Sequence, residues 1–182
     1  MLIEMEVSGL TVDSGSNTPI VILKEKDGER LLPIWIGVVE ASAIAFELEK
    51  MKLNRPMTHD LLKNAVESLG GQVEKVSVVA LRENTYYALI SIAQGGKTIE
   101  IDSRPSDAIA LALRTQAPIL CDQTVIERAH IKESDESQPL DETAAAERLS
   151  EDGPRPIFGT EHEDLNALLE GLKPEDFGKY KM

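Results

Sequence analysis

The feature that most constrains the fold is an order of three strands and a helix that occurs twice, at a spacing of 65 residues. In each copy, alternating apolar and polar residues indicate strands, and apolar residues at helical spacing then indicate a helix. At this spacing Ile34 aligns with Ile99, and residues 43–45 and 108–110 are both Ala-Ile-Ala. Coincidence among common helix-forming residues is the alternative, but the matched strand-to-helix junctions favour an internal duplication.

This order predicts an α+β fold in which duplicated strand-strand-strand-helix units form a mixed or antiparallel sheet with packed helices, followed by an acidic C-terminal extension. Strands are expected over residues 4–12, 19–23, 30–36, 73–81, 86–93, 97–102 and 118–121. Helices are expected over residues 39–53, 58–69, 106–115 and 123–131.

The distribution of charge predicts where the folded domain ends. Of the formal net charge of −13, residues 132–182 carry −8, and residues 132–163 are rich in Glu, Asp, Ser and Pro. A segment of this composition cannot bury enough apolar surface to form a core. We therefore expect a domain over residues 1–131, an acidic flexible linker over residues 132–163, and a short C-terminal helix and tail over residues 164–182.

The acidic composition excludes several classes of protein. A pI near 4.7 argues against a basic protein that coats nucleic acid or binds anionic membranes, although a local basic site is compatible with it. The single cysteine, Cys121, excludes an internal disulfide and is expected to be a buried structural thiol. The N-terminus lacks the features of a signal peptide, and no apolar run approaches about 18 residues, so a cytoplasmic protein is expected.

The strand-to-helix junction of the second copy gathers residue types suited to phosphate chemistry. Backbone N–H groups at a helix start and guanidinium groups bind phosphate oxygens, and paired carboxylates can hold Mg²⁺ or Mn²⁺. Proline suits the first helical position, so Pro105 predicts where the helix begins. The alternative is an ordinary capped helix in which Arg104 pairs with Asp107. The grouped side chains are Asp102, Ser103, Arg104, Ser106, Asp107 and Arg114.

A second Arg-Pro pair precedes the helix expected over residues 58–69. Thr58 is a plausible N-cap, and Asp60 in the first turn suits the helix dipole. The functional interpretation adds Arg55 as a phosphate contact and His59 as an acid or base. The alternative is a surface cap with an ordinary histidine.

Two further features favour structural interpretations. Glu40 and Glu47 are seven residues apart and are expected to form a solvated helix edge. Trp35 continues an alternating strand, so a place in the core or in an interface is expected.

Three runs of sequence carry a resemblance to a known family. They are LPIWIG followed by EA at residues 32–37 and 40–41, RPMTHDL at residues 55–61, and IDSRPSDAIALA at residues 101–112. In this order and spacing they resemble the motifs of the bifunctional nuclease domain family, over about residues 2–131. The closing run KPEDFGKY at residues 173–180 is similar to the tail of some bacterial members.

The resemblance implies a homodimer-forming α+β domain whose substrate is nucleic acid, both DNA and RNA. Some members carry a C-terminal helical module of the UVR type, and this chain has an acidic segment in its place. A role that depends on such a module is therefore not expected here.

The resemblance and the phosphate chemistry together give the hypothesis of metal-assisted phosphodiester hydrolysis. The expected catalytic residues are Asp102, Asp107 and His59, where the two carboxylates hold Mg²⁺ or Mn²⁺ and the histidine transfers a proton. The expected substrate-binding residues are Arg104, Arg55, Ser106 and Arg114.

Two other hypotheses remain open. In the first, the chain is a non-catalytic dimeric interaction or regulatory module, the junction residues form helix caps and dimer salt bridges, and the acidic tail binds a partner. In the second, the acidic segment occupies the basic site as a mimic of nucleic acid.

Overall fold

The computed structural model describes residues 1–51 and 53–136 of the chain. In chain order, the elements of this part are β1 (Leu2–Val12), β2 (Pro19–Glu25), β3 (Leu31–Trp35), α1 (Val38–Leu48), α2 (Thr58–Ser68), β4 (Gly71–Arg82), β5 (Thr85–Gln94), β6 (Lys97–Ser103), α3 (Pro105–Thr115), β7 (Ile119–Asp122) and α4 (Gln123–Glu136).

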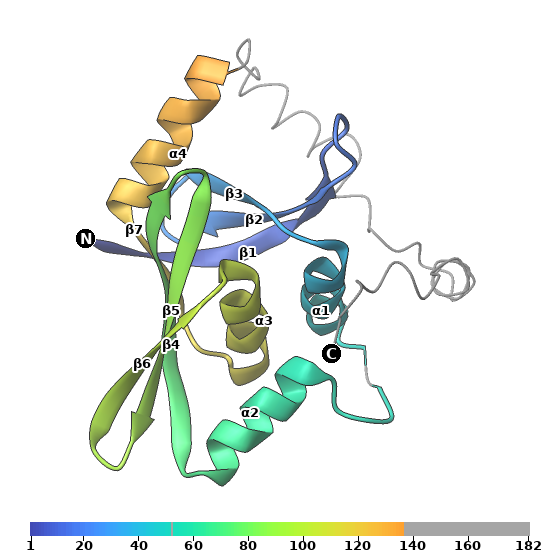
Figure 1. Cartoon of the computed structure of the whole chain (residues 1–182), viewed down its shortest axis with the longest axis vertical. Helices are drawn as coiled ribbons and strands as arrows, with labels where there is room; N and C mark the ends of the chain where they lie inside the picture. Colours follow the sequence, from blue (N-terminus) through green and yellow to red (C-terminus); the bar gives the residue numbers. More distant parts are fainter. Residues whose placement is uncertain (52, 137–182) are drawn as a thin grey trace, which may run out of the picture.

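The strands form one mixed sheet in the order β3-β2-β1-β7-β4-β5-β6. Strands β1–β3 and β4–β6 are two antiparallel meanders, and β7 joins them by pairing antiparallel with β1 and parallel with β4. In Figure 1 the strands of the β1–β3 meander run roughly horizontally, and those of the β4–β6 meander run roughly vertically. Each meander is followed by a helix, so the predicted α+β class with a mixed sheet is confirmed.

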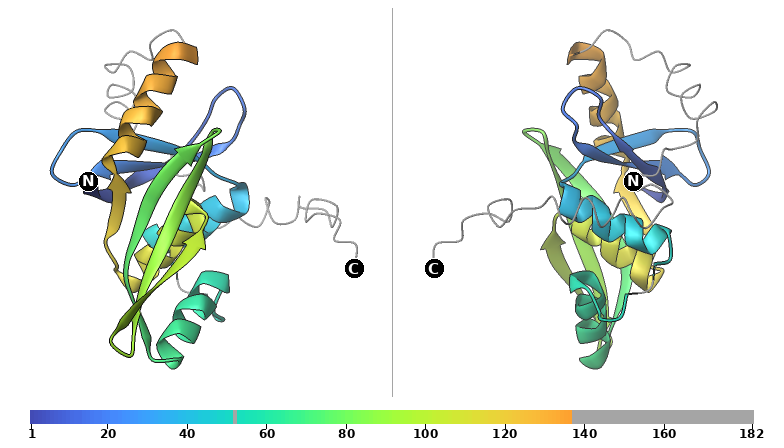
Figure 2. Two further views of the ribbon diagram at one scale, coloured as in Figure 1. Left: turned by 60° about the vertical axis from the view of Figure 1, so that its left-hand side comes forward. Right: turned by 90° about the vertical axis from the view of Figure 1, so that its right-hand side faces the viewer.

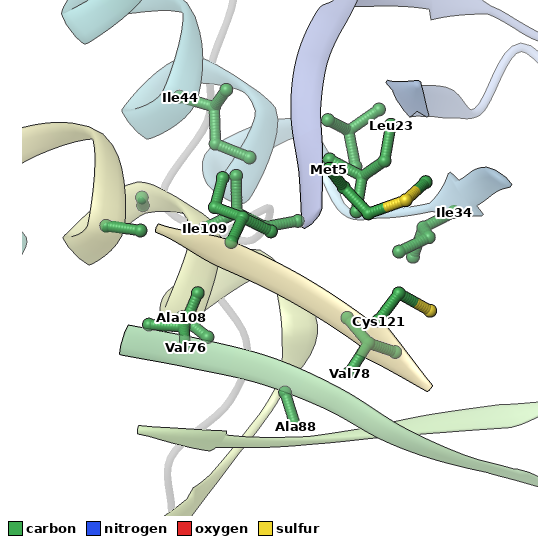
Figure 3. Packing of buried hydrophobic residues seen from close by; sticks show 14 of the residues in the cluster. Met5, Leu23, Ile34, Ile44, Val76, Val78, Ala88, Ala108, Ile109 and Cys121 are labelled. Atoms are coloured by element: carbon green, nitrogen blue, oxygen red, sulfur yellow. The ribbon is translucent and has the colours of Figure 1, made fainter. Parts of the chain in front are cut away.

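Helices α1 and α3 pack against each other and against the sheet. Both Ala-Ile-Ala triplets, residues 43–45 and 108–110, are buried, and their small side chains let the two helices approach closely. Figure 3 shows Ile44 and Ile109 pointing into one core. Figure 2 shows that α1, α2 and α3 lie on the same side of the β4–β6 meander. The two aligned triplets thus form the centre of the domain.

Helix α1 is shorter than predicted. The expected helix over residues 39–53 is wrong at its C-terminal end, because α1 ends at Leu48. Lys50 adopts a left-handed conformation with φ of 51°. The N–H groups of Lys50 and Met51 then donate to the carbonyl oxygens of Glu47 and Phe46, which closes the helix end. The sequence has no glycine at this position, so the signal that commonly marks such an end is missing.

Helix α2 and strand β6 expose apolar side chains. Helix α2 has no buried residue; its Leu61 is 62% exposed, and Leu69 at its C-cap is 74% exposed. On β6, Ile99 and Ile101 are about half exposed, whereas the aligned Ile34 and Ile36 are buried. The two copies therefore agree in sequence pattern and topology but differ in what covers them.

Helix α4 continues to Glu136, five residues beyond the predicted domain boundary at residue 131. The rest of the predicted acidic linker and the predicted C-terminal helix lie outside the described residues. Cys121 is buried as expected, and burial raises the pKa of its thiol to about 12. Within the described part of the chain, no helix is both long and apolar enough to cross a membrane.

Candidate functional site at the meeting of three helix N-termini

The first turns of α1, α2 and α3 meet at one place. Each helix begins after a residue with extended backbone, namely Gly37, Met57 and Arg104. Pro105 occupies the first position of α3, as predicted, because its fixed φ suits a helix start and its missing N–H costs nothing there. The unpaired N–H groups of a helix start carry partial positive charge, so three such starts favour negative charge at their meeting point.

Four charged or polar side chains form a continuous chain across these helix starts. Arg104 Nη1 donates to Glu40 Oε1 at 2.7 Å, and Arg104 Nε donates to Asp107 Oδ2 at 2.7 Å. The other oxygen of Asp107, Oδ1, lies 3.1 Å from His59 Nε2. We call the set Glu40, Arg104, Asp107 and His59 the junction cluster. It brings together three predicted site residues and adds Glu40.

The junction cluster is open on the side of its arginine. The Arg104 side chain is 65% exposed, whereas that of His59 is only 13% exposed. Burial raises the pKa of Asp107, but the hydrogen bonds from Arg104 and His59 outweigh this effect and hold it below its ordinary value. Asp107 is therefore ionised at neutral pH and accepts hydrogen bonds from both neighbours.

Glu40 reaches Arg104 because a glycine precedes it by one helical turn. A Cβ atom at Gly37 would collide with the carboxylate of Glu40, so the absence of a side chain lets this carboxylate fold back over the start of α1. The sequence interpretation of Glu40 as a solvated edge missed this contact. A sequence feature that could have indicated this contact is the alignment of the two copies at 65 residues. It aligns Glu40 with Pro105 and so places Glu40 at the equivalent strand-to-helix junction.

Arg114 ties α2 to α1 and α3. Its side chain is 4% exposed, and its Nε donates to Asp60 Oδ1 at 2.6 Å. Its Nη1 donates to the carbonyl oxygens of Ala43 and Ala110 at 3.0 and 2.9 Å. Asp60 in turn accepts the N–H of Met57 at 2.8 Å. The predicted substrate contact at Arg114 is thus a buried guanidinium that fixes the first turn of α2.

The position of Asp60 affects its ionisation and the placement of its neighbour. Burial raises the pKa of Asp60, but the Met57 N–H and the Arg114 guanidinium outweigh this effect and hold it below its ordinary value. Because His59 directly precedes Asp60, the Asp60–Arg114 pair also fixes where the imidazole lies against Asp107. Arg114 is therefore a positioning residue of the junction cluster.

The other predicted site residues lie around the junction cluster but not within it. Ser106 is buried and lines a hollow of about 250 Å³ beside Arg104. Arg55 lines a separate cavity of about 260 Å³, together with Asp60 and Arg114.

Asp102 does not meet Asp107. Side chains alternate between the two faces of a strand, and Ile101 shares a face with its β5 partner Ile90, which is in the core beneath α3. Asp102 is therefore on the opposite face of β6. Among residues 1–51 and 53–136, no three His, Cys, Asp or Glu side chains are grouped so that they could hold a metal ion. The two carboxylates expected to share a divalent cation are not brought together.

Comparison with known proteins decides the family. The family model described as the bifunctional nuclease domain matches residues 21–134, which include all four members of the junction cluster. The chain belongs to the bifunctional nuclease domain family. The resemblance of the three sequence motifs to this family is thereby confirmed.

Relatives of the chain occur in bacteria and plants. An uncharacterized protein of Mycobacterium tuberculosis is 36% identical over 174 residues, which cover 96% of this chain and 97% of the relative. Bifunctional nuclease 1 of Oryza sativa subsp. indica is 26% identical over 180 residues, which cover 93% of this chain and 54% of that protein. Bifunctional nuclease 1 of Arabidopsis thaliana is 30% identical over 105 residues, 56% of this chain and 32% of that protein. The family domain is therefore part of a longer chain in these plant nucleases.

Proposed function

We propose that this chain is a nuclease that hydrolyses phosphodiester bonds in DNA and RNA at the junction cluster. The observation that carries the proposal is the contact between His59 Nε2 and Asp107 Oδ1 beside an exposed arginine. Membership of the bifunctional nuclease domain family and the names of the plant relatives support the same chemistry.

His59 is suited to proton transfer because Asp107 orients it. With Asp107 ionised, Nε2 carries the proton of the neutral imidazole, and the second nitrogen, Nδ1, is left as the basic atom. A carboxylate that fixes the tautomer and stabilises the imidazolium is the arrangement that supports general base catalysis. In the proposed mechanism, His59 Nδ1 removes a proton from the attacking group.

Arg104 is suited to the phosphate. Its exposed guanidinium is already placed by two carboxylates, and guanidinium groups bind phosphate oxygens through paired hydrogen bonds. An incoming phosphodiester competes with Glu40 and Asp107 for the same donors, while the three helix starts add positive potential. Charge that develops on the phosphoryl oxygens is then stabilised by groups that were in place beforehand.

Cleavage of both DNA and RNA restricts which group can act as the nucleophile. DNA has no 2′-hydroxyl, so a site that cuts both DNA and RNA by one route must use water rather than a hydroxyl of the substrate. We therefore propose water as the attacking group, which transfers its proton to His59. The bond between phosphorus and the ester oxygen then breaks, and the leaving oxygen takes up a proton.

The assay compares cleavage of labelled single-stranded DNA and RNA by the wild type and by Arg104→Gln. We expect the variant to lose roughly ten- to thousandfold in kcat/KM, because one charged donor to the transition state is removed. Arms with Mg²⁺, Mn²⁺ and a chelator measure whether the predicted divalent cation takes part. Arg128→Gln, which changes an exposed arginine of α4, is the matched control.

Two outcomes of this assay count against the proposal. Equal cleavage by the wild type and Arg104→Gln would indicate a contaminating nuclease or another site. Absence of cleavage by both would favour the non-catalytic dimeric interaction module, in which the contacts of Arg104 with Glu40 and Asp107 serve only to join the helices.

We also propose that the chain forms a homodimer through the exposed apolar face of α2 and β6. Val66 of α2 and Ile92 of β5 approach each other at Gly71, and Ile99 pairs with Ile92, so the helix and the edge strand border one surface. Leu61, Leu69 and Ile101, on or next to the same two elements, are also exposed. An apolar patch of this kind on a folded domain marks an association site, because leaving it in water is unfavourable.

The double substitution Leu61→Glu/Leu69→Glu is expected to convert a dimer to a monomer in sedimentation equilibrium. Both side chains are exposed in the protomer, so the substitutions leave its core intact. Ser14→Glu, in the exposed turn between β1 and β2, adds negative charge elsewhere and is expected to leave the dimer unchanged. A wild type that sediments as a monomer would contradict the proposal.

A further inference from the structure

A hollow next to the junction cluster has the chemistry of a nucleobase subsite. Its volume is about 250 Å³, and Arg104 of the junction cluster forms part of its wall. The end of β3, the turn between β4 and β5, and the starts of α1 and α3 close around it. The hollow is thus continuous with the atoms proposed to bind the phosphate.

Trp35 supplies the hollow with an exposed aromatic surface. It is the only tryptophan of the chain, and it is 49% exposed at the end of β3. The sequence interpretation placed it in the core or an interface, yet alternation along β3 buries Leu32 and Ile34 and turns Trp35 to the other face. A half-exposed indole on the wall of a hollow leaves apolar surface in water, which a stacked ring would cover.

The rest of the wall contains amide and hydroxyl side chains, which can form hydrogen bonds with the edge of a base. Asn84 and Thr85 come from the tight turn between β4 and β5, and Tyr86 begins the wall on that side. Glu83 and Asn84 both have a left-handed backbone conformation, which gives the tight turn that joins β4 to β5. Amide and hydroxyl groups next to an aromatic face are the groups that ligand sites use to orient a flat polar ring.

We propose that this hollow binds an unpaired nucleobase of the substrate, stacked on Trp35, while the adjacent phosphate lies at Arg104. The inference rests on the proposed nuclease function and makes the substrate more specific. A base reaches the indole only when it is out of a duplex, so the preferred substrate is single-stranded DNA or RNA. Stacking is tolerant of base identity and of the sugar, which fits one site for both nucleic acids.

The single tryptophan makes the test direct. Hexathymidylate is titrated into the full-length wild type while the fluorescence of Trp35 is recorded, in chelator and in the cold to slow any cleavage. We expect saturable quenching. An abasic hexamer with the same phosphates, and a hairpin duplex of matched charge, are expected to leave the fluorescence nearly unchanged.

Substitution of the indole measures the contribution of stacking. Trp35→Leu is expected to weaken the binding of labelled hexathymidylate by roughly five- to hundredfold, the range for loss of one base–aromatic stack, whereas Trp35→Phe keeps most of the affinity. Tyr87→Leu is the matched control, because Tyr87 is also exposed but its ring lies against Arg82. Because the wild-type fluorescence is read without any substitution, the test does not depend on the folding of a variant.

The results separate the subsite from the nuclease function. Equal quenching by the abasic hexamer, or unchanged affinity of a folded Trp35→Leu, would overturn the subsite even if cleavage depends on Arg104. Saturable quenching by hexathymidylate alone, with cleavage that is the same in the wild type and Arg104→Gln, would support the subsite and overturn the proposed catalytic site.

Discussion

Replacement of His59 by asparagine is expected to lower the rate of phosphodiester cleavage by roughly two to four orders of magnitude, the usual contribution of a positioned acid–base group. Asparagine keeps an N–H donor toward Asp107 but has no atom that can take up a proton from water. His59 faces Asp107 of α3 and is not a member of the buried hydrophobic core, so its replacement leaves the core intact. The measurement is kcat on labelled single-stranded DNA and RNA at saturating substrate.

Three comparisons make this result specific. The thermal midpoint of His59→Asn should stay within a few degrees of the wild type. Hexathymidylate should still quench Trp35, because the proposed base contact does not involve the imidazole. Asp107→Asn should also lose activity, since an amide cannot hold the imidazole as a carboxylate does. A folded His59→Asn that cleaves at the wild-type rate would remove His59 from the mechanism.

Replacement of Arg114 by methionine is expected to destabilise the domain by about 2 kcal/mol, because a buried guanidinium loses its hydrogen bonds while its partner Asp60 keeps partial contact with water. Methionine fills part of the same space but removes the hydrogen bonds that Arg114 donates to Asp60 and to the carbonyl oxygen of Ala43. Urea unfolding followed by circular dichroism measures the free energy. The matched control Arg128→Met, at an exposed position of α4, should stay within about 0.5 kcal/mol of the wild type.

A lysine at position 114 should recover only part of the loss. Its ammonium is a point charge and cannot reproduce the separate donors that face Asp60 and the two helices. If Arg114→Met unfolds at the same urea concentration as the wild type, the hydrogen bonds of Arg114 to the three helices contribute nothing to the free energy of unfolding, and the prediction is wrong. A stable Arg114→Met with reduced cleavage would instead mean that Arg114 matters for the placement of His59 through Asp60 and not for the stability of the domain.

The Asp60–Arg114 pair also has a predictable pH dependence. The pKa of Asp60 is lower in the folded protein than its ordinary value of 3.8, so its contribution to stability is fully present above that value. It is lost as the pH falls and the carboxylate takes up a proton. The difference in stability between the wild type and Arg114→Met should therefore narrow below about pH 4.

The duplicated sequence pattern predicted the large-scale fold because it contains both the strand order and the core. The Ala-Ile-Ala triplets are buried as a pattern of small and branched side chains on a helix requires. Asp107 and Arg114 are seven residues apart, a spacing that puts both on one face of α3. Both do face the first turn of α2, where they contact His59 and Asp60 respectively. The sequence alone does not show that α2 packs on this face, which is why it predicts a substrate contact for Arg114 where the structure has a link between helices.

The predicted carboxylate pair shows where sequence proximity misleads. Asp102 and Asp107 are five residues apart, but a strand ends and a helix begins between them. One more residue on a strand moves a side chain to the opposite face, so Asp102 lies away from α3 although Ile101 lies toward it. Besides Arg104, which precedes it by three residues, the structure gives Asp107 a partner 48 residues away, His59, through a contact that depends on the packing of α2.

The position of β7 has a consequence for how the protein is synthesised. This strand of only four residues, Ile119–Asp122, is the last of the seven to be translated, yet it lies between β1 and β4 at the centre of the sheet. Until it leaves the ribosome, each of the two finished meanders presents an open backbone edge to other nascent chains. Long-range pairing of this kind slows folding, and open edges promote aggregation. Translation that stops before Ile119 would therefore release a product whose two meanders lack the strand that joins them into one sheet, and chaperones or proteases would be expected to bind its open edges.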